Sequence, residues 1–233
     1  TILKLFEARF AEQQREQWED IIQYLRALME LDKHSIVPEA EAPAYFEWAL
    51  WRAFLAIGSL VNSPWDARRF KIDQEFKPIG PSADDGPDMI FEFEDFVIVV
   101  EVTLNTSSCQ EVAEGESVRS HVATLVDHYA SKRKRVYGLF IANKIDTNTA
   151  ETFRNGSWYR SDDSRMELQI VPFTLKQFTD LFEVGFQGTS NLGYKTLEAI
   201  ITQCIQIKSN ADAPQWKSRI GEHVSVFVKS MGQ

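Results

Sequence analysis

The amino-acid sequence predicts an α/β fold in which a mixed central β-sheet is flanked by helices. In the middle of the chain, apolar strand-like runs alternate with helical segments in the order strand, helix, strand, helix, strand. Towards both ends, apolar residues recur at helical spacing instead. With 233 residues, of which 44% are hydrophobic, the chain has enough apolar material for one sizeable core. We therefore expect one domain over 1–233, with an N-terminal helix in 1–42, a core over 43–173 and C-terminal helices in 174–233.

The N-terminal part is predicted to contain two helices. Apolar residues keep a helical period from Leu3 to Leu31, which indicates one long amphipathic helix. Pro38 and Pro43 then interrupt the pattern, and a second helix is expected over 44–61. An Asn-Ser-Pro sequence directly after this segment should end it.

A β-hairpin is the first expected part of the sheet. The segment 70–88 is rich in Pro, Gly, Ser and Asp, so it should be a loop with at most one short strand. Alternating residues over 89–94, a tight turn at Glu94-Asp95 and a nearly continuous β-branched run over 96–104 predict the hairpin. Its second strand should be buried on both faces.

The remaining elements follow in alternation. The pattern predicts a helix over 117–134, a buried strand over 136–142, a short helix over 146–155 and a strand over 166–171 that Pro172 ends. Three further helices are expected in the C-terminal part, over 174–182, about 194–207 and 215–229.

Charge and cysteine content narrow the classes of function. Lys and Arg number 25 against 34 Asp and Glu, giving a formal net charge of −9, which argues against a free-standing nucleic-acid binder. Cys109 and Cys204 are too few for a disulfide framework or a zinc site, so a reducing cytoplasm is the expected compartment. The longest fully apolar run, 96–100, is too short for a membrane helix, and we expect no membrane partner.

Two acidic residues stand out on the predicted hairpin. Asp88 enters it, and Glu101 lies inside its second strand between Val100 and Val102. An ionised carboxylate is costly to bury there unless a cation or hydrogen bonds compensate it. Adjacent strands can bring both carboxylates to one point, and two such oxygen ligands suit Mg²⁺. The alternative is structural, with Glu101 facing solvent at a strand edge and Asp88 capping a turn.

Several motifs together resemble a known nuclease family. Pro87-Asp88, a spacer and Glu101-Val-Thr resemble the PD-(D/E)xK nuclease motif. In combination with three further segments, 43–54, 78–80 and 114–121, they are similar to the cleavage domain of the AlwI and MlyI group of type IIS restriction endonucleases, which includes related nicking enzymes. The resemblance covers roughly 44–182, whereas the first 41 residues and the C-terminal helices match only loosely.

The resemblance implies a restriction-endonuclease-like core and a set of site residues. Asp88 and Glu101 match the metal-binding carboxylates, with Mg²⁺ as the cofactor and Mn²⁺ able to substitute for it. Glu47 matches an acidic residue that the superfamily places on an early helix beside the site. Glu114 and His121 match a further acidic residue and the histidine that this group adds.

One position departs from the superfamily pattern. Thr103 stands where a lysine normally helps to orient the attacking water. His121 could polarise water near neutral pH, and Glu114 could act as a base or hold a second metal ion. The alternative is that His121 is a polar residue on an amphipathic helix, although the family resemblance favours the functional role. The basic cluster 132–135 could contact phosphates or be a solvated helix end.

The expected function is Mg²⁺-dependent hydrolysis of one strand of double-stranded DNA. No helix-turn-helix, zinc finger or strongly basic segment is present to read bases, so recognition would come from another domain or a large subunit. The alternative from a different class is a catalytically silent interaction subunit that keeps the fold as a scaffold, which Thr103 and the acidic composition favour.

Overall fold

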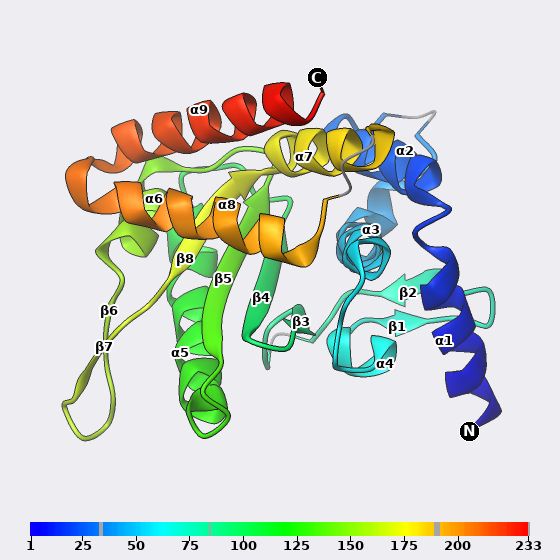
Figure 1. Cartoon of the computed structure of the whole chain (residues 1–233), viewed down its shortest axis with the longest axis horizontal. Coiled ribbons are helices and arrows are strands. Elements are labelled where there is room, and N and C mark those ends of the chain that lie inside the picture. The colour runs from blue at the N-terminus through cyan, green and yellow to red at the C-terminus, as the bar shows by residue number, and fades with distance from the viewer. Residues whose placement is uncertain (33–34, 84, 189–191, 233) are drawn as a thin grey trace.

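A computed structural model describes residues 1–32, 35–83, 85–188 and 192–232 of the chain (Figure 1). Its main sheet has four strands in the spatial order β3-β4-β5-β8. The antiparallel pair β3–β4 is followed by parallel pairing of β4 with β5 and of β5 with β8, so the predicted mixed sheet is confirmed. The strands are β3 (Met89–Glu92), β4 (Phe96–Thr103), β5 (Arg135–Ala142) and β8 (Ile170–Thr174).

Helices flank this sheet, and two short hairpins extend from it. Each hairpin is an antiparallel pair: β1 (Lys71–Ile72) with β2 (Pro78–Gly80), and β6 (Ser157–Tyr159) with β7 (Arg165–Glu167). The helices are α1 (Ile2–Gln13), α2 (Trp18–Met29), α3 (Ala42–Ile57), α4 (Pro64–Ala67), α5 (Glu116–Ala130), α6 (Thr147–Asn155), α7 (Leu175–Gln187), α8 (Tyr194–Gln206) and α9 (Ala213–Met231). Three short turns accompany them, η1 (Glu39–Glu41), η2 (Glu111–Gly115) and η3 (Ile207–Asn210).

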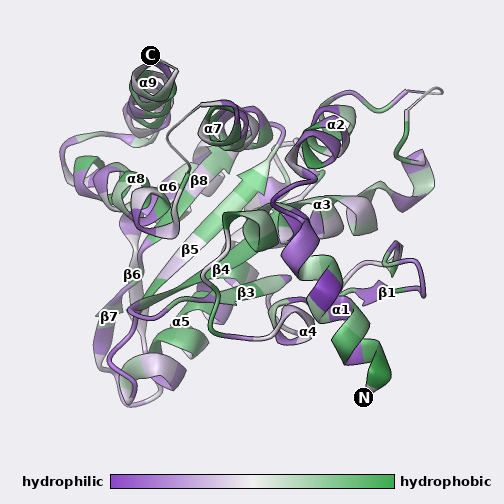
Figure 2. Ribbon diagram, turned by 45° about the vertical axis from the view of Figure 1, so that its right-hand side comes forward, coloured by the Kyte–Doolittle hydropathy of each residue, from purple (hydrophilic) through white to green (hydrophobic). Residues whose placement is uncertain are grey.

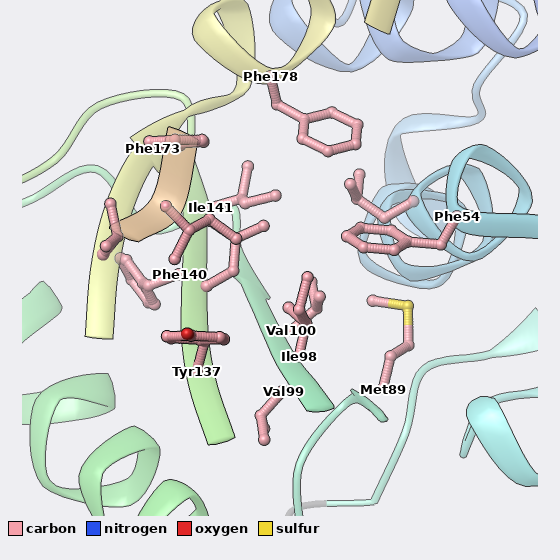
Figure 3. Close-up of a cluster of buried hydrophobic side chains, with 14 of the residues drawn as sticks. Phe54, Met89, Ile98, Val99, Val100, Tyr137, Phe140, Ile141, Phe173 and Phe178 are labelled. Carbon is pink, nitrogen blue, oxygen red and sulfur yellow. The ribbon is translucent and has the colours of Figure 1, made fainter. Parts of the chain in front are cut away.

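The core lies between the sheet and the helices that pack on it. Strands β4 and β5 are mostly hydrophobic (Figure 2), and the first six residues of β4 are buried. Phe54 from α3 and Phe178 from α7 reach the same cluster as Val100 and Ile141 of the sheet (Figure 3). The rings of Phe54 and Phe178 lie 5.8 Å apart. This apolar packing anchors α3 against β3 and β4 and α7 against β8.

Helix α5 approaches β5 closely at a glycine. A Cβ atom on Gly138 would lie 2.9 Å from side-chain carbons of both Ile170 and Val122, and the latter belongs to α5. The absent side chain therefore lets α5 lie flat against the strand. This packing brings the N-terminal half of α5 beside the carboxyl-terminal half of β4.

The expected long N-terminal helix is wrong, because the chain forms two helices with a break over 14–17. Gln14 is fully buried in this break, where its side-chain nitrogen donates to the Phe10 carbonyl. The guanidinium of Arg52, itself 2% exposed, donates to Gln14, Gln17 and Asp20. Hydrogen bonding of this buried cation needs side-chain oxygens from the break itself and from the first turn of α2, a tertiary requirement that local periodicity does not reveal.

Other differences concern where elements end. Helix α3 ends at Gly58, whose φ of +79° only glycine adopts without strain, rather than at the Asn-Ser-Pro sequence. The loop 70–88 contains two short strands instead of at most one. Pro172 lies inside β8 rather than after it, because β8 is an edge strand and one side needs no N–H donor.

The structure bears on two further features of the sequence, the absence of a predicted membrane helix and the state of the two cysteines. No helix in the described ranges is both long and apolar enough to span a membrane. Both cysteines are free, with Cys109 exposed and Cys204 buried. Burial raises the pKa of the Cys204 thiol to about 12.

Candidate functional site

Asp88 and Glu101 meet at one end of the β3–β4 hairpin. Met89 pairs with Val100, so Asp88, one residue before the strand, comes opposite Glu101. The Asp88 backbone N–H points to Oε2 of Glu101 at 3.4 Å, and the Val102 N–H donates to Oδ2 of Asp88 at 2.8 Å. Glu101 is only 7% exposed, so it does not face solvent at a strand edge. The hairpin thus places the half-buried Asp88 beside the buried Glu101.

Glu47 lies on α3 and faces the same place. Its side chain is 4% exposed, although it carries a carboxylate. Ser82 supplies its hydrogen bonds, with the backbone N–H 3.1 Å from Oε1 and 3.0 Å from Oε2, and the hydroxyl donating to Oε2 at 2.5 Å. The Ser82 hydroxyl oxygen also lies 3.4 Å from the Asp88 carbonyl oxygen. Ser82 therefore links the helix to the start of the hairpin.

Burial and mutual repulsion disfavour ionisation of these carboxylates. Burial raises the pKa of Asp88 to about 9, and the charges of Glu101 and Glu47 add to the effect. Burial likewise raises the pKa of Glu47 to about 7, although the Ser82 hydrogen bonds oppose the increase. Clustered acidic groups without a compensating cation are typical of a site built for one.

His121 and Glu114 complete the group from the far side of β4. Nδ1 of His121, on α5, lies 2.7 Å from Oε1 of Glu101. Oε1 of Glu114, on η2, accepts a hydrogen bond from the Thr103 hydroxyl at 3.0 Å. The charge of Glu114 also contributes to the raised pKa of Asp88. All five site residues predicted from the sequence are therefore brought to one region.

Thr103 does not stand free at the position of the superfamily lysine. Besides donating to Glu114, its hydroxyl oxygen accepts from the Asn105 N–H at 3.1 Å. The basic cluster 132–135 lies elsewhere, because Lys134 pairs with Glu92 at 2.8 Å, at the opposite end of β3. Arg135 pairs with Glu198 at 2.9 Å. These cations balance acidic residues of the chain itself, so the cluster is not a set of unpaired phosphate ligands.

Ser82 is a site residue that the sequence analysis missed. It lies in the segment read as an irregular loop, where a single serine gives no pattern. The only available signal was its position shortly before Pro87-Asp88, because that segment had to bring the chain to the hairpin. Its contact with Glu47 depends on the tertiary packing of α3 against β2, the strand that directly precedes Ser82.

The carboxylates of Asp88 and Glu101 fit a Mg²⁺ ion that keeps several waters, and they do not fit an ion enclosed entirely by protein ligands. Within the described part of the chain, no group of three or more His, Cys, Asp or Glu side chains is arranged to hold a metal ion. Mg²⁺ keeps several waters and commonly binds through one or two carboxylates plus substrate phosphates. Asp88 and Glu101 offer two such carboxylates. The pKa of Asp88 is raised by burial first and by the charges of Glu101 and Glu47 second, and a bound divalent cation would offset both.

A larger hollow lies away from these residues. A cavity of about 710 Å³ lies between α1 and the β1–β2 hairpin and includes Phe6, Arg68 and Ile79 in its walls. None of the five carboxylate and histidine residues lines it. The candidate active site is therefore the carboxylate cluster and not this cavity, because the cluster brings acidic groups and a histidine into mutual contact.

Comparison with protein families decides the relationship. The family model of the AlwI restriction endonuclease matches residues 1–181. The chain belongs to the AlwI restriction endonuclease family. The match begins at residue 1, so the N-terminal helices α1 and α2 are part of the family region, whereas the sequence analysis placed the resemblance from about residue 44. No curated protein matches the sequence significantly.

A solved structure shares the fold of this AlwI-family chain. It is the crystal structure of the small subunit (R.BspD6I2) of the heterodimeric restriction endonuclease R.BspD6I. The superposition has a TM-score of 0.65 and 24% sequence identity, and covers 91% of this chain and 98% of that one. At this identity the likeness establishes the fold, and the predicted restriction-endonuclease-like core is confirmed.

Proposed function

We propose that this AlwI-family chain is the cleavage module of a type IIS restriction or nicking endonuclease, and that it hydrolyses one strand of double-stranded DNA. The observation that carries the proposal is the pairing of Asp88 with Glu101 on adjacent strands. Glu47 on the neighbouring helix and His121 in contact with Glu101 support it. Such a group of acids has little structural benefit, because burial and the charge of Glu101 raise the pKa values of Asp88 and Glu47.

Asp88 and Glu101 would hold Mg²⁺, with Mn²⁺ as a substitute. When bound, the ion would polarise the scissile phosphate and lower the pKa of an attacking water. Glu101 is oriented for this by His121 on one oxygen, which leaves Oε2 directed towards Asp88. Asp88 is oriented by the Val102 N–H on Oδ2. The chain thus fixes both carboxylates through contacts that do not depend on a ligand.

The other acidic residues would act around this pair. Glu47, held by Ser82, adds negative charge that favours cation binding and can bind a water of the ion. Glu114 is held by Thr103 and can accept a proton or hold a second ion. The remaining nitrogen of His121, Nε2, is available to contact a water or a phosphate oxygen.

Sequence recognition would come from a partner. The net charge of −9 opposes tight DNA binding by the chain alone. The small subunit R.BspD6I2 belongs to a heterodimeric enzyme, and we propose that this chain likewise acts with a large subunit or a recognition domain. We place this assembly in the reducing cytoplasm, where the free thiols Cys109 and Cys204 would persist.

A second candidate is a catalytically silent interaction subunit with the nuclease fold. The specific observation in its favour is Thr103 in place of the lysine. The two candidates are distinguished by incubating supercoiled plasmid with a high concentration of the purified chain in Mg²⁺ or Mn²⁺. If the chain is a cleavage module, wild type should nick the plasmid and Asp88→Ala and Glu101→Ala should not. If it is a silent subunit, all three proteins should show the same low level of plasmid nicking.

A further inference from the structure

A small cavity with two lysines opens at the same edge of the sheet as the carboxylate cluster. It has a volume of about 190 Å³ and is lined by Asn143, Lys144, Ile145, Pro172, Thr174, Gln177 and Lys217. These residues come from the loop after β5, from β8, from the start of α7 and from α9. In Figure 1, α7 and α9 lie above the upper ends of β5 and β8. The lining contains two cations and no acidic residue, in a chain with an excess of acids.

The register of the sheet places this cavity beside the candidate active site. Thr103 of β4 pairs with Ala142 of β5, which in turn pairs with Thr174 of β8. Two strand spacings therefore separate Thr103 from Thr174, a distance of about 10 Å. Because a DNA strand has one phosphate per about 3.4 Å of helix axis, this separation spans about three nucleotides. The strand ends beside the two places thus lie within the span of a few nucleotides of one DNA strand.

The two ammonium groups have donors to spare. Lys217 Nζ donates to the Ile145 carbonyl at 2.7 Å and lies 3.3 Å from the Thr147 hydroxyl oxygen, so its position is fixed by two contacts. An ammonium group has three donors, which leaves one for a ligand. Lys144 is exposed, and across residues 1–32, 35–83, 85–188 and 192–232 its ammonium makes no hydrogen bond or ion pair.

A buried glutamine fixes the backbone of Lys144 relative to the site. Gln110 is fully buried, and its side-chain nitrogen donates to the carbonyls of Asn105 at 2.6 Å and Lys144 at 3.0 Å. Its side-chain oxygen accepts from the Asp146 N–H at 2.9 Å. The loop after Thr103 and the loop that carries Lys144 are therefore tied together. The N-terminus of α7 offers fewer hydrogen-bond donors to a ligand, because the backbone N–H groups of Thr174 and Gln177 are already bonded within their capping box.

We infer that Lys144 and Lys217 bind a backbone phosphate of the DNA strand that is cleaved, a few nucleotides from the scissile bond. This inference rests on the proposed nuclease function and adds a DNA contact to it. Phosphate contacts of this kind position a strand without reading its sequence. They also offset the repulsion between the strand and the nearby carboxylates.

The test measures DNA binding without requiring cleavage. Fluorescence anisotropy with a labelled 20-base-pair duplex in EDTA, from 20 to 200 mM salt, would compare wild type with Lys144→Gln, Lys217→Gln and the double variant. Loss of this phosphate contact should make the negative slope of log K against log salt shallower by about 0.9, and the double variant should bind at least about 10-fold more weakly at low salt. Lys229→Gln is the matched control, since it removes the same charge about 18 Å further along α9.

A second readout is protection of lysines from acylation, followed by mass spectrometry. The duplex should protect Lys144 and Lys217 and leave Lys229 reactive. Equal affinity and slope in the double variant, absence of salt-dependent binding by wild type, or protection by inorganic phosphate as strong as by duplex would overturn the inference. Because Lys144→Gln removes an exposed side chain, it stays informative even if Lys217→Gln unfolds. Loss of plasmid nicking in Asp88→Ala alone tests the nuclease function separately.

Discussion

Nδ1 of His121 lies 2.7 Å from Oε1 of Glu101, and Oε2 of the same carboxylate lies 3.4 Å from the backbone nitrogen of Asp88. Glu101 is therefore held between a histidine on α5 and the start of the hairpin. This geometry favours a role in which His121 orients Glu101, rather than one in which Nδ1 acts on water directly. It makes His121 a positioning residue with one nitrogen still available.

His121→Ala should weaken Mg²⁺ binding. Loss of a group that orients a metal ligand typically costs 10–100-fold in metal affinity or activity, so we expect the Mg²⁺ midpoint of nicking to rise by about that factor. Titration of Mg²⁺ at fixed pH measures it, with His128→Ala, on the far part of the same helix, as the control. An unchanged midpoint with a plateau lowered about 10²–10⁴-fold would instead assign direct acid–base chemistry to His121.

Asp88→Asn should abolish nicking and stabilise the metal-free protein. The pKa of Asp88 is raised from 3.8 to about 9, so between these values the native state keeps a proton that the unfolded chain has lost. The free energy of unfolding should therefore fall as pH rises from about 4 to about 9. At pH 8 in EDTA we expect the variant to melt at least about 4 °C above wild type. This prediction would be refuted if the melting temperatures of the two proteins changed with pH in the same way between pH 5 and 9.

Mg²⁺ binding should release protons. Because the pKa values of Asp88 and Glu47 are raised to about 9 and about 7, both groups hold protons near neutral pH that a cation must displace. The apparent affinity should rise up to about 10-fold per pH unit for each proton displaced. Calorimetric titration in buffers of different ionisation enthalpy measures the number released. An affinity independent of pH between 6.5 and 8.5 would show that Asp88 is not a ligand and that Glu47 does not lie beside the bound ion.

Ser82→Ala should shift the acidic limb of the activity profile to higher pH. The Ser82 hydroxyl and backbone N–H both lower the pKa of Glu47, so losing the hydroxyl should raise that pKa above about 7. At pH 6.5 we expect about 10-fold less activity than wild type, with most of it recovered at pH 8.5. Ser225→Ala, on the exposed side of α9, controls for handling. A uniform loss at every pH would indicate a structural effect instead.

Sequence patterns predicted the sheet and its carboxylates because those signals are local. The nearly continuous β-branched run that became β4 is a strand signal in itself, and Glu101 stands out within it as an acid among buried residues. The hairpin register then follows from the tight turn, which places Asp88 opposite Glu101. His121 and Glu114 were found through the family resemblance, since neither has a distinctive local pattern.

The parts that sequence reasoning missed depend on distant contacts. The break after α1 exists because buried Arg52 on α3 needs oxygens from Gln14 and Gln17. Ser82 became a site residue only when β2 was packed against α3 beside Glu47. The hydrogen bond between Thr103 and Glu114 likewise joins the end of a strand to a later turn. The presence of Thr103 in place of the superfamily lysine did not by itself indicate this contact.

We propose above that this AlwI-family chain cuts DNA once another domain or subunit has positioned the chain on the duplex. The most direct measurement fuses the chain to an unrelated DNA-binding domain of known site and maps strand breaks on a duplex that carries that site. We expect Mg²⁺-dependent cleavage of one strand near the bound site, and intact DNA with the Asp88→Asn fusion at equal site occupancy. Intact DNA with the wild-type fusion in both Mg²⁺ and Mn²⁺, or equal cleavage by the Asp88→Asn fusion, would contradict it.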